Sequence, residues 1–184
     1  MSAPILMDRA LSTLLVVDVQ GRLLPAIDAG DAVLGHCVAL VSAAGEMAVP
    51  CVISEQYPEG LGPTVDTLLD VAAKAQRVTK RHFSCVAEGC LAATAVSARP
   101  QVVVCGTEAH VCVQQTVLEL LAQGKTVFVV ADAVGSRLAL SKQLALERMC
   151  AAGAAVVTRE MVIFEWLRVA GTDEFRRIHQ RYLR

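Results

Sequence analysis

Short, mostly apolar segments alternate with segments of helical periodicity along almost the whole chain, and this alternation limits the possible fold more than any other feature. Apolar runs bounded by Gly, Pro or polar residues are typical of strands that are buried on both faces. Such strands are expected near Leu14–Val19, Cys51–Ser54, Arg77–Thr79, Gln101–Cys105, Thr126–Val130 and Ala154–Thr158. Strands that alternate with helices form βαβ units. We therefore predict an α/β fold, a Rossmann-like three-layer α/β/α sandwich around a central parallel sheet of about six strands.

The segments between the strands carry apolar residues every three or four positions, which predicts helices. They run near Asp31–Met47, Thr64–Ala72, Cys90–Ala98, Ala109–Gln123, Lys142–Ala152, Met161–Val169 and Thr172–Tyr182. Pro50 and Pro100 each lie just before a strand, where a missing N–H is tolerated, and Gly124 and Gly153 each follow a helix, as C-terminal caps do. Because no linker, repeat or low-complexity tract divides the chain, residues 1–184 are predicted to form a single domain.

The balance of apolar and charged residues predicts much buried surface. Of the 184 residues 54% are hydrophobic and 19% are charged, and the net charge is −1. This charge, with few aromatic residues and no interleaved basic patch, argues against nucleic-acid and anionic-membrane partners. The longest apolar region, 32–45, is interrupted by His36 and is short for a membrane span.

The stretch 26–48 is apolar nearly all round and must be covered on more than one side, which predicts a homo-oligomer, a dimer or larger.

The cysteines and the first residues predict a cytoplasmic protein. The seven cysteines are odd in number, and several lie in apolar strand or helix patterns, as free thiols of a reducing compartment do. The N-terminal MSAPILMDRALST lacks the basic start, long apolar core and cleavage site of a secretory signal. No Cys-x-x-Cys pair, dinucleotide glycine motif, phosphate loop or Gly-x-Ser-x-Gly elbow is present in the sequence. We expect no metal and no cofactor.

Cys112 is the first candidate for chemistry. The apolar run that ends at Cys105 is broken by Gly106, and helical spacing begins at about Ala109, so Cys112 falls in the first turn of a helix that follows a strand. Free N–H groups and the positive end of the helix dipole favour the nucleophilic thiolate there. On spacing alone, a small buried hydrophobe is the favoured interpretation of Cys112.

Two further polar residues change that balance. Asp18 interrupts the apolar run of LLVVDVQ, and a carboxylate flanked by valines is costly unless it is paired or used. Lys80 follows the short strand near Arg77–Thr79. Asp18, Lys80 and Cys112 would thus each lie at the carboxyl end of a parallel strand, the edge where open α/β sheets bind ligands. We predict that the three side chains converge.

In this order, LLVVDVQ, a Lys followed by FS, and G-x-E-x-H-V-C-V at a strand–helix junction resemble the isochorismatase-like cysteine hydrolases. The similarity runs from about Ser12 to about Leu167. SEQYPEGLGPTV and LERMCAAGAAVVTREMVIFEWL are similar to one branch, the isochorismatase-domain or YcaC-related proteins. Nicotinamidases of this family carry an Asp/His metal cluster after the second strand. The corresponding SEQYPEG has no His, so no metal is carried over.

The resemblance implies a metal-independent mechanism. Cys112 would attack a carbonyl carbon, Asp18 would take the thiol proton and return it to the leaving amine, and Lys80 would hold Asp18. The resemblance also implies an oxyanion site made by the N–H groups of Cys112 and Glu108, after a cis peptide between Thr107 and Glu108. Candidates for substrate binding are Gln20, Gln56, Tyr57, Phe83 and His110. A local hydrogen-bonding role suits His110 better than catalysis.

The expected activity is hydrolysis of a small C–N substrate, such as an amide or carbamoyl compound, through a covalent cysteine intermediate. One alternative is vinyl-ether hydrolysis of the isochorismatase type, which can proceed without the Cys. Another is a non-catalytic binding or assembly protein that retains the fold, and a third is oxidation chemistry at Cys112. The sequence leaves these alternatives open.

Overall fold

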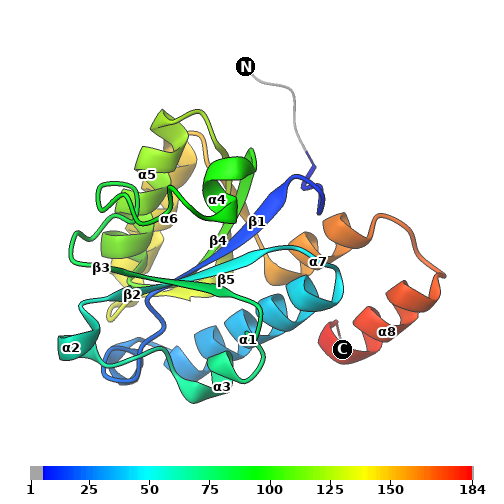
Figure 1. Ribbon diagram of the computed structural model, residues 1–184, viewed down its shortest axis with the longest axis horizontal. Coiled ribbons are helices and arrows are strands. Elements are labelled where there is room, and N and C mark those ends of the chain that lie inside the picture. The colour runs from blue at the N-terminus through cyan, green and yellow to red at the C-terminus, as the bar shows by residue number, and fades with distance from the viewer. Residues whose placement is uncertain (1–5, 184) are drawn as a thin grey trace.

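A central sheet of parallel strands forms the middle layer of the computed structural model, which describes residues 6–183 (Figure 1). The strands are β1 (Ser12–Val17), β2 (Cys51–Gln56), β3 (Gln76–Lys80), β4 (Gln101–Thr107), β5 (Thr126–Gly135) and β6 (Ala155–Val157). Their order is β3-β2-β1-β4-β5-β6, and every neighbouring pair is parallel. The predicted three-layer α/β fold is confirmed.

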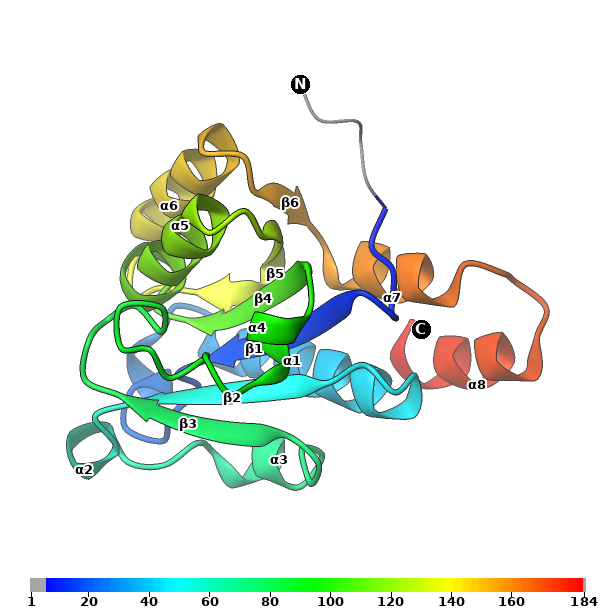
Figure 2. The same ribbon diagram turned by 45° about the horizontal axis from the view of Figure 1, so that its top comes forward.

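Helices cover both faces of the sheet (Figures 1 and 2). The helices are α1 (Gly30–Glu46), α2 (Pro58–Leu61), α3 (Asp66–Leu69), α4 (Ala95–Ala98), α5 (Gln114–Ala122), α6 (Ala139–Ala151), α7 (Arg159–Leu167) and α8 (Asp173–Tyr182), with short turns η1 (Leu24–Ala26) and η2 (Ala109–Val113). Helices α1, α3, α7 and α8 lie on one face, and α4, α5 and α6 lie on the other. None of the helices in residues 6–183 is long and apolar enough to cross a bilayer.

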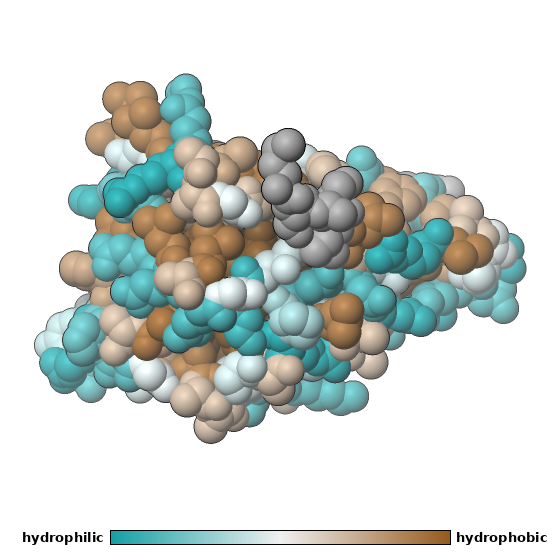
Figure 3. Space-filling view, turned by 90° about the horizontal axis from the view of Figure 1, so that it is seen from above, coloured by the Kyte–Doolittle hydropathy of each residue, from teal (hydrophilic) through white to brown (hydrophobic). Residues whose placement is uncertain are grey.

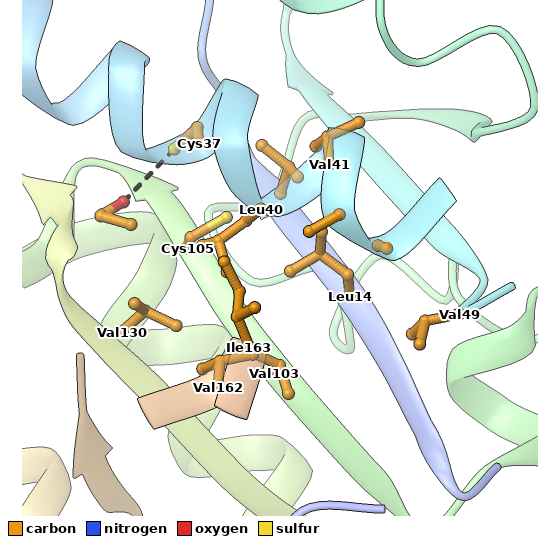
Figure 4. Close-up of a cluster of buried hydrophobic side chains, with 14 of the residues drawn as sticks. Leu14, Cys37, Leu40, Val41, Val49, Val103, Cys105, Val130, Val162 and Ile163 are labelled. Carbon is orange, nitrogen blue, oxygen red and sulfur yellow. Dashed lines mark hydrogen bonds between the residues drawn. The ribbon is translucent and has the colours of Figure 1, made fainter. Parts of the chain in front are cut away.

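Alternate residues of the buried strands supply the two halves of the core, because successive side chains of a strand point to opposite faces. Leu14 and Val16 join the cluster under α1 and α7, whereas Leu15 and Val17 join the one under α5 and α6. Figure 4 shows part of the first cluster, where Cys37 of α1 donates its thiol hydrogen to the Ala133 carbonyl at 3.4 Å. Strands buried on both faces explain the continuous apolar runs of the sequence.

Three expected helices differ from the structure. The segment expected as a helix at Thr64–Ala72 is helical only in α3, and the segment Cys90–Ala98 is helical only in α4, because Thr94 adopts an extended backbone and its hydroxyl caps Val96 N. The expected helix at Ala109–Gln123 divides into the π-helical turn η2 and the α-helix α5. Local turn chemistry interrupts each apolar periodicity at these points.

The irregular stretch after β2 is held against the end of β1 by hydrogen bonds. Glu55 accepts hydrogen bonds from the backbone N–H and the hydroxyl of Thr64, both on Oε1, at 2.8 and 2.7 Å. Gly21 N–H donates to the Pro63 carbonyl at 3.0 Å. The end of β1 and the segment 57–64 therefore form one unit.

Candidate active site

Asp18, Lys80 and Cys112 lie at the same edge of the sheet, as the sequence predicts. Asp18 directly follows β1, Lys80 is the last residue of β3, and Cys112 lies in η2, which follows β4. From β1 the chain passes to β2 on one side and later returns to β4 on the other, so the space between β1 and β4 is the switch point of the topology. Ligands of open α/β sheets bind in the crevice at such a point.

Asp18 and Lys80 form a fully buried ion pair. Lys80 Nζ donates to Asp18 Oδ2 at 2.7 Å, and both side chains are inaccessible to solvent. Ser54 Oγ donates to the second carboxylate oxygen, Oδ1, at 2.7 Å. Burial by itself disfavours the Lys80 ammonium, but the Asp18 carboxylate and neighbouring thiols outweigh it and raise the pKa of Lys80. Lys80 is therefore held as a cation beside Asp18.

The backbone of Asp18 is held in an uncommon conformation. Its φ is 53°, a left-handed value that Asp tolerates better than most residues. Thr107 Oγ1 donates to the Asp18 carbonyl at 2.7 Å. Gly106 passes so close to β1 that a Cβ on it would overlap the Val17 carbonyl oxygen. The end of β4 thus fixes where β1 ends, one residue before the carboxylate, and β1 stops at Val17 rather than at Val19.

Cys112 is buried at 4% exposure next to this pair. Its Sγ lies 3.9 Å from the amide oxygen Oε1 of Gln56, a long contact for a thiol donor. Burial raises the pKa of the Cys112 thiol, the Asp18 charge raises it further, and Lys80 opposes them. Burial and the Asp18 charge therefore oppose the thiolate expected at this helix N-terminus, and the raised pKa favours the neutral thiol.

The peptide bond between Thr107 and Glu108 is trans, which corrects the expected cis bond. The strand β4 continues through Thr107, which pairs with Gly135 of β5. The chain therefore passes from the strand into η2 through a trans peptide bond. Trans is also the isomer favoured by roughly 3–4 kcal/mol for a residue other than proline.

Glu108 points to a polar cluster on the β5 side of the site. Arg137 Nε donates to its Oε1 at 2.6 Å, and His110 Nδ1 lies 3.3 Å from its Oε2. His110 Nδ1 also lies 3.0 Å from the Ser136 hydroxyl. The local hydrogen-bonding role expected for His110 agrees with these contacts.

The other candidates for substrate binding divide into two groups. Gln20 and Gln56 are buried, and their amides bond to the protein itself. Tyr57 and Phe83 are 43% and 52% exposed, and the Arg81 guanidinium lies 4.9 Å from the Tyr57 ring centre. A cavity of about 200 Å³ opens beside Tyr57, Lys80 and Arg81. A larger one, about 620 Å³, lies beside Gly45, Pro50 and Ala72, next to the amino end of β2, far from the ion pair.

Sequence reasoning missed Ser54 and Cys85. Ser54 is paired in register with Val17 and ends the apolar part of β2, so a polar residue at a strand end was its only signal. Cys85 is fully buried in the turns after β3 and contributes to the charge environment of Lys80, and a hydrogen bond with Cys90 lowers its pKa. Cys85 lies in an irregular segment, where no strand or helix periodicity in the sequence could indicate that its thiol is near the site.

No group of three or more His, Cys, Asp or Glu side chains within residues 6–183 has the arrangement of a metal site. The charge that faces Cys112 comes instead from Asp18 and Lys80. Together they place a carboxylate able to take a proton, a fixed ammonium and a protonated thiol at one point.

Known proteins share both the sequence pattern and the fold. The family model of the isochorismatase domain matches residues 12–161. Isochorismatase domain-containing protein 1 of Danio rerio is 37% identical over 157 residues, which are 85% of this chain and 55% of that protein, so the chain spans about half of that relative. The structure of MAR1 ribonuclease from Caenorhabditis elegans has a TM-score of 0.92 at 31% identity and covers 98% of this chain and 93% of its own. YcaC from Pseudomonas aeruginosa, with hexane-2,5-diol and covalent acrylamide, has a TM-score of 0.89 at 26% identity and covers 97% and 92%.

Proposed function

The chain belongs to the isochorismatase family, and on that premise we propose that it is a metal-independent hydrolase of a small C–N substrate that acts through a covalent cysteine intermediate. The observation that carries the proposal is the buried ion pair of Asp18 and Lys80 beside the Cys112 thiol. A charge pair without solvent access costs several kcal/mol of desolvation for each ion, so a use for it is favoured over simple stabilisation.

In the proposed reaction the Cys112 thiol is the nucleophile and the Asp18 carboxylate transfers the protons. As Cys112 Sγ attacks the carbonyl carbon, its proton passes to Asp18, and the carbonyl oxygen becomes an oxyanion. Asp18 then gives the proton to the leaving nitrogen, the C–N bond breaks, and an acyl-thioester remains on Cys112. Water attacks this thioester and loses a proton to Asp18, which returns it to the departing sulfur. Lys80 stays protonated and stabilises the carboxylate and the developing thiolate.

The oxyanion is proposed to bind at the start of η2. The first amides of a helix have no intrahelical partner, and they point toward a group that lies before the helix. The N–H groups of Cys112 and Glu108 were implied by the resemblance. With the preceding bond in trans, we retain the Cys112 N–H as the primary donor.

The depth of the site favours a small substrate over a polymer. Asp18 is inaccessible to solvent and Cys112 is 4% exposed, so a group that reaches both must enter the protein. A small amide or carbamoyl compound can do so, whereas the backbone of a folded RNA cannot. Because the similar Caenorhabditis elegans protein is named a ribonuclease, RNA must also be tested as a substrate.

The deciding experiment is a panel of small amides, carbamoyl compounds, vinyl ethers and a short RNA, assayed with wild type, Cys112→Ala and Cys112→Ser. We expect hydrolysis of a C–N compound that falls by about 10³-fold or more in both variants and is unchanged by EDTA. Acrylamide, bound covalently in the Pseudomonas aeruginosa protein, is a suitable mass-labelling probe. Cys150→Ala, which removes an exposed thiol, is the matched control.

Turnover that persists in Cys112→Ala, or cleavage of RNA alone, would overturn the proposal. Activity that EDTA removes and zinc restores would also do so. Wild-type protein that turns over none of the compounds and leaves Cys112 unlabelled would favour a binding or assembly protein instead.

A further inference from the structure

Every polar atom of Gln56 has a partner within the site. Its N–H donates to Gln20 Oε1 at 2.8 Å, and its carbonyl accepts from Gln20 Nε2 at 3.0 Å. Its side-chain Nε2 donates to the Arg81 carbonyl at 2.8 Å, and its Oε1 accepts from Lys80 Nζ at 2.7 Å. Gln56 is 8% exposed, so little of it is left for a ligand.

The side-chain oxygen of Gln56 lies between the Lys80 ammonium and the Cys112 thiol. The contact to Lys80, at 2.7 Å, is short and charge-assisted, whereas the contact to the thiol is 3.9 Å. The stronger contact decides the role, because a hydrogen bond to a charged group is worth about twice a neutral one. Asp18 and Gln56 thus each accept a short hydrogen bond from the Lys80 ammonium.

Gln20 fixes Gln56 in turn. The side-chain amide of Gln20 bonds to both backbone groups of Gln56, as a neighbouring strand would. Its Nε2 also donates to the Gly62 carbonyl at 2.6 Å. Gln20 is fully buried and lies two residues after Asp18. The carboxylate and the support of Gln56 therefore come from one short segment, so Asp18, Gln56 and Lys80 belong to a single hydrogen-bonded network.

We propose that Gln56 is a positioning residue for the reaction, which aims the Lys80 ammonium at Cys112, and that Gln20 is the support of Gln56 and not a ligand of substrate. This inference rests on the proposed function and revises the expectation that both glutamines bind substrate. Loss of the Gln56 amide leaves Lys80 attached to Asp18 alone, so the charge that stabilises the forming thiolate moves away from the sulfur.

The test follows the pH profile of Cys112 modification by methyl methanethiosulfonate, a small reagent with no amide to bind, read by peptide mass analysis. The charged groups that face Cys112 are Asp18 and Lys80. Lys80→Met is expected to move the profile to higher pH and Asp18→Asn to lower pH. Gln56→Met is expected to move it part of the way toward Lys80→Met, making modification at a fixed pH about 3- to 10-fold slower.

A double variant separates positioning from a direct effect. In a Lys80→Met background, Gln56→Met is expected to cause no further shift, because the effect passes through Lys80. Gln56→Asn, which withdraws the amide by one methylene, is the milder variant if Gln56→Met is poorly folded, and is expected to shift the profile in the same direction. Gln143→Met, at an exposed site on α6, controls for the substitution itself.

Two results would overturn the inference. One is a Gln56→Met profile equal to wild type while Asp18→Asn and Lys80→Met shift as expected, which leaves the proposed function standing. The other is a Gln56→Met effect that persists undiminished without Lys80. Profiles that none of the Asp18 and Lys80 variants move would instead contradict the proposed function itself. With a substrate in hand, positioning predicts a fall in kcat at nearly constant KM, whereas substrate binding predicts the reverse.

Discussion

The carboxylate of Asp18 reaches the ammonium of Lys80 across an intervening strand. Asp18 follows β1 and Lys80 ends β3, and β2 lies between these strands in the sheet. The middle strand supplies Ser54 to the carboxylate and Gln56 to the ammonium. Side chains of β2 therefore supply hydrogen bonds to both ions, which replace some of those that water would make to them in solution.

Removal of one ion is expected to destabilise the protein more than removal of both. Asp18→Asn or Lys80→Met leaves an uncompensated buried charge, which costs about 3–5 kcal/mol of the free energy of unfolding. The double variant Asp18→Asn/Lys80→Met is expected to recover a large part of that loss. Urea denaturation of the four proteins measures it. Additive losses in the double variant would contradict a mutually compensated pair.

The pH dependence of Cys112 follows from its raised pKa. Burial favours the neutral thiol, so the thiolate forms only above the usual thiol pKa of about 8.5, and modification should still be rising at that pH. The thiol of a short unstructured peptide, measured in parallel, is the reference. A Cys112 profile that levels off below the peptide's would show that the helix end and Lys80 outweigh burial.

Gly106→Ala is expected to be severely destabilising. The new Cβ would overlap the backbone of Val17, and φ of 116° is unfavourable for any residue with a Cβ. We expect a loss of about 3 kcal/mol or more, with misplacement of the neighbouring Asp18. Gly35→Ala, in open space on α1, is the matched control and should stabilise by about 0.5–1 kcal/mol. Equal melting temperatures for the two variants would refute this account of Gly106.

Glu46 joins the C-terminal helix to α1. It accepts hydrogen bonds from Arg177, Arg181 and Tyr182, and although burial opposes the effect, these bonds lower its pKa. A lowered pKa stabilises the folded state above the unfolded value of about 4.3, and this contribution is lost as the pH falls through the folded value. Glu46→Gln should lower Tm by about 2–4 °C at pH 7, with the difference closing below about pH 4. A constant difference at all pH values would argue against the ionic contribution.

We expect a homo-oligomer in solution. Leu138, Leu140 and Leu144, at the start of α6, are 67%, 63% and 54% exposed. Figure 3 shows groups of hydrophobic residues between hydrophilic ones on one face, and contiguous apolar surface often marks a site that a partner covers. Light scattering at micromolar concentration measures the mass. A monomer of about the chain mass, 19.5 kDa, would contradict the expectation.

The sequence by itself determined the layers of the fold and the edge that holds the site. Apolar runs such as Val102–Cys105 predict strands buried on both faces, because a strand with one solvated face would alternate in polarity. Parallel strands end at a common edge, so the positions of Asp18, Lys80 and Cys112 after their strands were enough to predict that they meet. These inferences depend on local pattern and on chain direction, and both are present in the sequence.

Only the tertiary structure decided how the residues at that edge interact. The sequence around Cys112 favours a thiolate, yet the pKa of this thiol is raised, because the fold buries it and brings the charge of Asp18, which is distant in sequence, close to it. Gln20 and Gln56 are residue types that often bind substrates. Their hydrogen-bond partners are set only by the packing of β1, β2 and the segment 57–64 against one another. Burial and hydrogen-bond partnership are sums over contacts between distant segments, and for that reason a local pattern does not contain them.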